Sequence, residues 1–453
     1  MTIKKHAKAG GGVDFQIEGP QLTRAVVVHV ERKTRNEAHS YDRDAQSKLA
    51  EAIGLAQAID LEIIDTIIAS IAAPKPGTYI GTGKVAEIAK RVEAAEAELV
   101  IVNAQLSPAQ QRNLETEWKA KVLDRTGLIL EIFGRRAVTK EGMLQVELAH
   151  LHYQKSRLVR SWTHLERQRG GFGFIGGPGE SQLEMDRRLI EERVSKIKGE
   201  LETVVKTRDL HRKGRERIAY PIVALVGYTN AGKSTLFNKL TSANVLAKDL
   251  LFATLDPTMR NLVLPSGRQI ILSDTVGFIS ELPTTLIASF RATLEEVLAA
   301  DIILHVRDVS HSETEAQSND VSIVLGDLGI DEQQRNQIIE VWNKADLLDP
   351  LDFATRETQA QRRDDCVLVS SLDGQGIDEL LEKIEKRLAA KSEIFDITVD
   401  PTDGKGMAWL HQRGEVLDRK RYEDGRTKLS VRFDGDTAGQ AMAKFGKAME
   451  SKT

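Results

Sequence analysis

Ile222-Val-Ala-Leu-Val-Gly-Tyr-Thr-Asn-Ala-Gly-Lys-Ser234 is the stretch of sequence that decides the fold. Its first five residues form a continuous apolar run, which is typical of a buried central strand. The run enters a glycine-containing loop, residues 227–234, and a helix is predicted to begin at the end of that loop. This order indicates a phosphate-binding loop, because successive backbone N–H groups and the helix N-terminus then face a phosphate.

The residue types in this loop suit a nucleotide. Gly227 and Gly232 let the backbone wrap around the phosphates. Lys233 supplies a cation to the β- and γ-phosphates, and Ser234 offers its hydroxyl to Mg²⁺. A glycine turn with an incidental Lys-Ser pair is the alternative, which the later motifs oppose. The predicted nucleotide contacts are Gly227, Tyr228, Thr229, Asn230, Ala231, Gly232, Lys233, Ser234 and Thr235.

A second motif follows the strand-like run at residues 270–273. In Asp274-Thr-Val-Gly277 the carboxylate can hold the magnesium shell, and Gly277 can approach the γ-phosphate. Alone, Asp-x-x-Gly is only a turn signal, but its place after the phosphate loop suits a nucleotide switch. The predicted contacts are Asp274, Thr275, Val276 and Gly277.

Between these motifs, Phe252-Ala-Thr-Leu-Asp-Pro-Thr258 is the candidate segment that covers the γ-phosphate when GTP is bound. We predict Thr254 as a magnesium ligand beside Ser234 and Asp274, with Thr258 as the rival. A turn at Asp256-Pro257 that Thr254 caps is the alternative. The predicted nucleotide contacts are Phe252, Ala253, Thr254, Leu255 and Asp256, and the predicted catalytic residues are Lys233, Thr254 and Gly277.

The choice of base is predicted to depend on Asn343-Lys-Ala-Asp346, which follows the strand-like run at residues 338–342. Asp346 can accept two hydrogen bonds from the N1–H and N2–H₂ edge of guanine, which adenine does not present. A helix-starting turn without a ligand is the alternative. Ser370-Ser-Leu372 follows another strand and is placed to support the base through backbone N–H groups. The predicted contacts are Asn343, Lys344, Asp346, Ser370, Ser371 and Leu372.

The order of these four motifs over residues 220–391 resembles the translation-factor-like GTPases of the P-loop class. In many GTPases a glutamine follows the second motif and orients the attacking water, whereas Phe278 stands here. We therefore predict slow hydrolysis by positioning and electrostatics alone, with a partner needed to complete the site.

Composition limits the function classes. The chain has 453 residues, of which 41% are hydrophobic and 29% charged, so several compact folded units are expected. No apolar run approaches the ~18 to 20 residues that a membrane span needs, and no signal region follows Met1, so a cytoplasmic protein is expected. Lone Cys366 is predicted to be a buried strand residue rather than a metal ligand. We expect a monomer.

We predict an α/β fold with five parts. It comprises a flexible N-terminus, an N-terminal α/β domain, a long helical hairpin, a P-loop GTPase domain and a small C-terminal α/β domain. The predicted bounds are 1–20 for a flexible N-terminus, 21–136 for the N-terminal domain, 137–218 for the hairpin, 219–392 for the GTPase domain and 393–453 for the C-terminal domain.

The predicted hairpin has two apolar stripes at heptad spacing, separated by the glycine-rich residues 170–179. The stripes are Leu144, Leu148, Leu151, Leu158, Trp162 and Leu165, then Leu183, Ile190, Val194, Ile197, Leu201 and Val204. From residue 135 to 217 there are 19 Lys or Arg against 12 Asp or Glu, in a chain of net charge −4. A solvated helical face is one interpretation of this surplus. Phe172 and Phe174 beside Arg167 and Arg169 favour an RNA contact surface, because rings stack on bases and guanidinium groups pair with phosphates.

A second nucleotide site at Gly81-Thr-Gly-Lys84 is not predicted. The spacing is wrong for a phosphate loop, and a turn that opens a helix over residues 85–94 explains these residues better.

Several stretches resemble the HflX family over almost the whole chain. They are Tyr79-Ile-Gly-Thr-Gly-Lys-Val85, Asp124-Arg-Thr-Gly-Leu-Ile-Leu130, Gly177-Pro-Gly-Glu-Ser-Gln-Leu-Glu-Met-Asp-Arg-Arg188 and residues 252–258. The glycine-rich tip of the predicted hairpin departs from the usual family pattern, because Gly176 stands where the family has an arginine and Ser181 where it has a threonine. The resemblance implies a bacterial-type GTPase that binds the large ribosomal subunit and its rRNA and dissociates idle or stalled ribosomes under stress.

The sequence suggests three candidate functions for the chain. The first is a ribosome-acting GTPase that binds GTP or GDP with Mg²⁺. The second is a non-catalytic RNA-binding or ribosome assembly protein whose nucleotide only sets its conformation. The third, an ATPase or nucleotide kinase, is opposed by Asp346, because its carboxylate selects guanine.

Overall fold

The structure is a computed structural model of the chain. It describes residues 22–32, 43–168, 182–215, 220–241, 251–252, 254–255, 258–281, 296–390 and 392–452. The predicted flexible N-terminus, residues 1–20, lies outside this set. Contacts divide the chain into two compact units, one from the described parts of 1–135 and 153–183, the other from those of 136–152 and 184–453.

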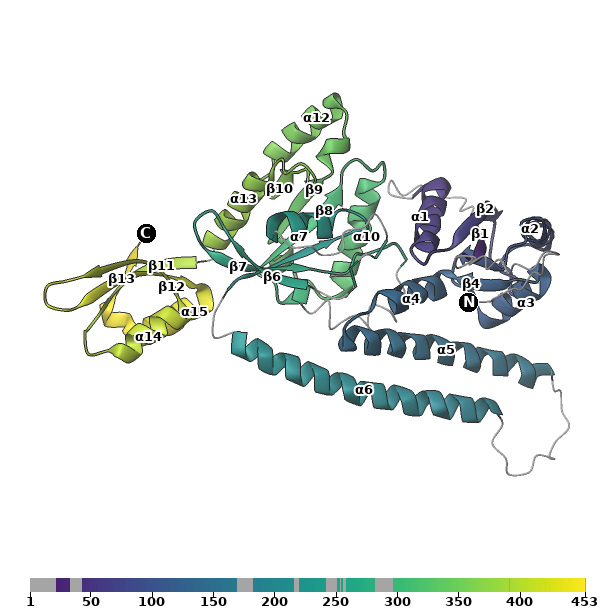
Figure 1. Cartoon of the computed structure of the whole chain (residues 1–453), viewed down its shortest axis with the longest axis horizontal. Coiled ribbons are helices and arrows are strands. Elements are labelled where there is room, and N and C mark those ends of the chain that lie inside the picture. The colour runs from purple at the N-terminus through teal and green to yellow at the C-terminus, as the bar shows by residue number, and fades with distance from the viewer. Residues whose placement is uncertain are drawn as a thin grey trace, which may run out of the picture. The chain divides into compact units, whose positions relative to one another are not determined.

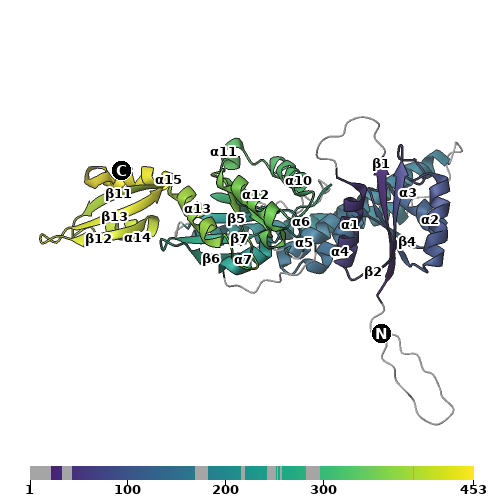
Figure 2. The same cartoon turned by 90° about the horizontal axis from the view of Figure 1, so that it is seen from above.

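The N-terminal domain is built on a parallel sheet of four strands in the order β2-β1-β3-β4. Its strands are β1 (Arg24–Arg32), β2 (Glu62–Ile71), β3 (Leu99–Asn103) and β4 (Lys121–Asp124). Its helices are α1 (Ala45–Gln57), α2 (Thr82–Ala94), α3 (Pro108–Trp118) and α4 (Arg125–Arg136). The side chains of Val26, Val28 and Val100 pack with α2 and α3 in one apolar core. This is the alternating α/β arrangement that the sequence predicts (Figures 1 and 2).

Two long helices follow, α5 (Lys140–Gln168) and α6 (Gln182–Arg215) (Figure 1). Arg193 of α6 donates two hydrogen bonds to the carboxylate of Glu147 in α5, at 2.7 and 2.8 Å. From the predicted stripes, Leu144, Val194 and Ile197 are buried. The glycine-rich tip lies outside the described residues, as do the side chains of Leu158, Trp162, Leu165 and Leu183.

The domain that the sequence predicts to be a GTPase contains a sheet of six strands in the order β10-β9-β8-β5-β7-β6, in which only β6 is antiparallel to its neighbour. The strands are β5 (Ile222–Gly227), β6 (Thr258–Val263), β7 (Gln269–Asp274), β8 (Ile302–Asp308), β9 (Ile338–Asn343) and β10 (Cys366–Leu368). The helices are α7 (Lys233–Thr241), α10 (Thr314–Asp327), α11 (Glu332–Arg335), α12 (Pro350–Gln361) and α13 (Ile377–Ala389), with a 3₁₀ turn η1 (Ala345–Leu347).

Successive residues of these strands face opposite sides of the sheet. Val341 and Val367 belong to the core that α7 and α13 cover, whereas Trp342 and Cys366 belong to a second core with α12. Because helices cover both faces, the inner strands are mostly apolar, and the polar residues Asp274, Asp308 and Asn343 lie at the carboxyl ends of their strands. The predicted burial of Cys366 is confirmed.

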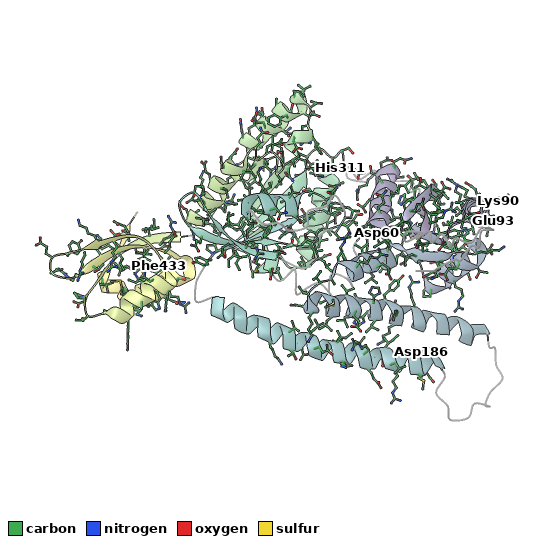
Figure 3. All side chains as sticks on the ribbon, viewed as in Figure 1. Asp60, Lys90, Glu93, Asp186, His311 and Phe433 are labelled. Atoms are coloured by element: carbon green, nitrogen blue, oxygen red, sulfur yellow. The ribbon has the colours of Figure 1, made fainter. Side chains whose placement is uncertain are left out.

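The C-terminal domain has an antiparallel sheet in the order β12-β13-β11-β14. Its elements are β11 (Ser392–Val399), α14 (Gly404–Arg413), β12 (Glu415–Arg421), β13 (Thr427–Asp434), α15 (Gly435–Phe445), the 3₁₀ turn η2 (Gly446–Ala448) and β14 (Met449–Lys452). Phe433, labelled in Figure 3, packs with Leu410 of α14 and Ala441 of α15 in a separate core.

Candidate nucleotide-binding site

The predicted phosphate loop, residues 227–234, connects β5 to α7 in a conformation that only glycine tolerates at two points. Gly227 has φ 151°, and a β-carbon there would lie 2.2 Å from the carbonyl oxygen of Val306. Gly232 has φ 91°, and a β-carbon there would lie 2.2 Å from Nδ2 of Asn343. Both glycines are therefore required by close packing as well as by the backbone conformation.

Lys233 begins α7 and is directed back onto its own loop. Its ammonium group donates hydrogen bonds to the carbonyl oxygens of Gly227 at 3.1 Å and Tyr228 at 2.7 Å. Only 7% of the residue is exposed. Burial lowers the pKa of this ammonium to about 8, and the nearby Asp274 carboxylate opposes that shift. An anion beside Lys233 would stabilise its charged form.

Three predicted metal ligands lie together. The Ser234 hydroxyl donates to Oδ2 of Asp274 at 2.7 Å and lies 2.8 Å from the Thr254 hydroxyl. Asp274 is fully buried, and its Oδ1 has no hydrogen-bond partner among the described residues. Burial raises the pKa of this carboxyl group, while its contacts with Ser234 and Lys233 lower it. The rival Thr258 begins β6 opposite Asp274.

This group of oxygens fits Mg²⁺ bound together with a nucleotide. Such an ion takes one or two protein oxygens and completes its shell with water and phosphate. An unpartnered, buried carboxylate oxygen beside two hydroxyl groups provides that kind of site. No cluster of three or more His, Cys, Asp or Glu suited to a metal occurs in the described part of the chain.

Gly277 lies against the phosphate loop. A β-carbon on it would lie 2.9 Å from Cγ2 of Thr229 and 3.0 Å from Nζ of Lys233. The next residue, Phe278, is bound to the phosphate loop through its backbone. The Thr229 N–H donates to the Phe278 carbonyl oxygen at 2.7 Å, and the Phe278 N–H donates to the Gly227 carbonyl oxygen at 3.1 Å. The ring of Phe278 is buried, with 2% of the residue exposed. A side chain directed into the core does not orient a water molecule at the loop.

Thr275 and Val276, between Asp274 and Gly277, are also buried. The Thr275 hydroxyl donates to the carbonyl oxygen of Leu225 at 2.6 Å, which ties this motif to β5.

The residues predicted to bind the base form a connected set. Asn343 donates through Nδ2 to the Ala231 carbonyl at 2.9 Å and accepts at Oδ1 from the Ser371 N–H and hydroxyl at 3.0 and 2.7 Å. The Ser370 hydroxyl donates to Asp346 Oδ1 at 2.7 Å. These contacts join the phosphate loop to residues 343–346 and 370–372. They lie at the carboxyl ends of the strands, which is where ligands bind in open α/β sheets.

The remaining predicted contacts fall into two groups. Phe252 and Leu255 are buried, Thr235 is half-buried, and Asn230 and Leu372 are exposed. Ala253 and Asp256 lie outside the described residues. The sequence did not indicate Asp308, whose carboxylate lies 2.8 Å from the ammonium of Lys344. An acidic residue at the end of an apolar strand is the signal that could have found it.

Four family models match the chain. Those described as GTP-binding GTPase N-terminal and GTP-binding GTPase Middle Region match residues 46–134 and 136–215. The models described as 50S ribosome-binding GTPase and HflX C-terminal domain match residues 222–344 and 356–453. GTPase HflX of Magnetococcus marinus is 50% identical over 388 residues, which cover 85% of this chain and 88% of that protein.

The chain belongs to the HflX family of GTPases. GTPase HflX of Escherichia coli is 42% identical over 411 residues, or 90% of this chain and 93% of that protein. A putative GTP-binding protein 6 of Xenopus laevis is 36% identical over 410 residues, or 89% and 76%. As an HflX GTPase, the chain binds and hydrolyses GTP. The roles of individual site residues remain predictions.

In this HflX chain the stretch Gly81-Thr-Gly-Lys84 lies at the start of α2. Gly81 has φ −66° and precedes α2, and Lys84 forms an ion pair with Glu87 at 2.7 Å, so the Gly-Thr-Gly-Lys stretch opens a helix. Within the described ranges, no helix combines the length and the apolar character that crossing a membrane requires.

Proposed function

We propose that this HflX GTPase acts on the ribosome through the large subunit, that its helical hairpin contacts rRNA, and that it dissociates stalled or idle ribosomes. The observation that carries the proposal is the pairing of a GTPase domain, matched by a model described as 50S ribosome-binding, with a basic hairpin in an acidic chain. RNA affinity depends largely on cations that pair with phosphates.

The hairpin offers such cations on its surface. Lys196, Lys198 and Lys206 of α6 are exposed along the helix. Arg187 and Arg188 are also more than half exposed and form ion pairs with Glu191 and Glu192 one turn later. Exposed pairs of this kind contribute little to stability, so their arginines remain available to a stronger anion.

We further propose that hydrolysis by the isolated protein is slow and that the ribosome completes the site. Lys233 and Asp274 supply electrostatic positioning, and Mg²⁺ held by Ser234, Thr254 and Asp274 would neutralise charge on the phosphates. No polar side chain follows Gly277 to orient water, since the buried Phe278 occupies that place. A group from a partner is therefore needed to reach full turnover.

The test is GTP turnover by the purified chain, measured with and without isolated large ribosomal subunits. We expect turnover to rise roughly 10³-fold or more with large subunits, on the scale at which a single supplied group acts in other GTPases. Equal turnover in both conditions would contradict the proposal, as would rapid turnover by the protein alone.

A companion measurement asks whether ribosome dissociation depends on the nucleotide site. Lys233→Ala removes the predicted phosphate cation, and ribosome dissociation is followed by light scattering. Loss of dissociation supports a requirement for nucleotide at this site, whereas full dissociation by this variant would indicate that nucleotide hydrolysis is unnecessary.

A further inference from the structure

The carboxylate of Asp308 lies at the carboxyl ends of the sheet strands, where the predicted base contacts also lie. Asp308 ends β8, and its partner in the neighbouring strand is Asn343, the last residue of β9. Its Oδ2 lies 2.8 Å from Nζ of Lys344, and its side chain is 12% exposed. None of the four nucleotide motifs includes it.

Both oxygens of this carboxylate are engaged. Oδ1 accepts a hydrogen bond from the Ser310 N–H at 3.0 Å and another from the Ser310 hydroxyl at 2.6 Å. Oδ2 faces Lys344. Because Ser310 holds one oxygen, the other has a fixed direction, and the carboxylate is a rigid acceptor rather than a mobile surface charge.

Lys344 has an unusual backbone. Its φ is 65° and its ψ 36°, which is the left-handed region that a residue with a β-carbon rarely adopts. Such a conformation costs free energy and is found at sites where a particular direction of the side chain matters. The bend places Lys344 between Asn343, which contacts the phosphate loop, and Asp346, which contacts Ser370.

A lysine has four rotatable side-chain bonds, and fixing them on ligand binding costs conformational entropy. The ion pair with Asp308 fixes the Lys344 side chain before nucleotide arrives, so less entropy is lost on binding. Its ammonium has three N–H groups. One can serve Asp308 while two remain for the nucleotide.

We propose that Asp308 is a positioning residue for guanine nucleotide, which acts by holding Lys344 in its binding conformation. The inference rests on the predicted contact between Lys344 and the nucleotide. It concerns affinity and is independent of whether the ribosome is the partner.

The experiment measures the Kd of a fluorescent GDP for the full chain, with stopped-flow dissociation rates, and the KM for GTP. For Asp308→Asn we expect a Kd roughly tenfold higher, mostly through faster dissociation. The substitution should raise the KM for GTP and leave kcat unchanged. The matched control is Asp327→Asn, the same change at an exposed position at the end of α10, which should leave affinity and turnover unchanged.

A double-mutant cycle tests the mechanism. If Asp308 acts through Lys344, then Asp308→Asn adds little further loss of affinity in a Lys344→Ala background. Additive losses, or an Asp308→Asn variant that binds GDP as tightly as the unaltered chain, would overturn the proposal. Asp308→Glu, which keeps the charge, should recover part of the affinity, and this variant decides the question if Asp308→Asn does not fold.

The two possible failures are distinguishable. Normal GDP affinity in Lys344→Ala would show that the predicted base contact is wrong, and the role of Asp308 would fail with it. Reduced affinity in Lys344→Ala together with normal affinity in Asp308→Asn would reject Asp308 alone.

Discussion

At the scale of single residues, Lys233 gives the site a pH dependence. Burial lowers its pKa from 10.5 to about 8 in the nucleotide-free protein, and bound phosphates would raise that pKa again. Between pH 8 and the pKa of the bound state, binding therefore takes up a proton. Affinity for GDP should then fall as the pH rises above about 8, approaching tenfold per pH unit.

Titration calorimetry or fluorescent GDP binding between pH 7 and 9, where the guanine N1–H keeps its proton, measures this dependence. Lys233→Arg is the control, because its guanidinium keeps its charge over this range. We expect weaker binding by that variant but little change with pH. An unaltered chain whose affinity is constant from pH 7 to 9 would contradict the assignment of Lys233 to the phosphates.

What the sequence could predict at this scale depends on where a residue lies relative to a motif. Ser234, Thr254 and Asp274 are far apart in the chain, and the predicted phosphate loop and switch explain why they meet. The contact of Asp308 with Lys344 and the backbone pairing of Phe278 with Gly227 and Thr229 were not predicted. Both depend on strand register, which no local pattern specifies.

At the scale of elements, the connection from β5 to α7 depends on Gly232. In Gly232→Ala the new β-carbon meets Nδ2 of Asn343, in a backbone conformation with φ 91° that disfavours any side chain. Asn343 must move, and its bond to the Ala231 carbonyl is lost. We expect the free energy of unfolding to fall by about 1–3 kcal/mol and GDP affinity to fall at least tenfold.

Gly199→Ala is the matched control for this substitution. Gly199 lies within α6, and a β-carbon there meets nothing within 4 Å. Alanine in a helix should raise stability by about 0.5–1 kcal/mol, and GDP binding should not change. Thermal unfolding and GDP titration of both variants make the comparison. Equal behaviour of the two variants would show that the loop has no special need for glycine.

Elements also show a limit of prediction. In the GTPase domain, β5, β7, β9 and β10 were predicted because their residues form apolar runs. In the C-terminal domain, by contrast, β12 was not predicted. Five of the seven residues of β12 are exposed, from Leu417 to Arg421, because it lies at the sheet edge. A strand with so little burial has no apolar alternation to recognise.

At the scale of the whole molecule, the proposed rRNA contact predicts that charge on the hairpin controls ribosome affinity. Lys196→Glu with Lys198→Glu reverses two exposed charges on α6, the helix on which Figure 3 labels Asp186. If both lysines pair with phosphates, affinity for large subunits should fall at least tenfold, and the salt dependence should weaken by about one unit of slope per contact.

Sedimentation with large subunits across a salt series measures both quantities. The control carries the same charge change elsewhere, with Lys90→Glu in α2 and Lys386→Glu in α13, both exposed. GDP binding without ribosomes should be unaffected in either double variant. Because long-range attraction depends on net charge, the control should lose some affinity, but its salt slope should match that of the unaltered chain. Equal losses of affinity and equal salt slopes in both double variants would mean that only the total charge matters. That result would contradict a specific rRNA contact of the hairpin.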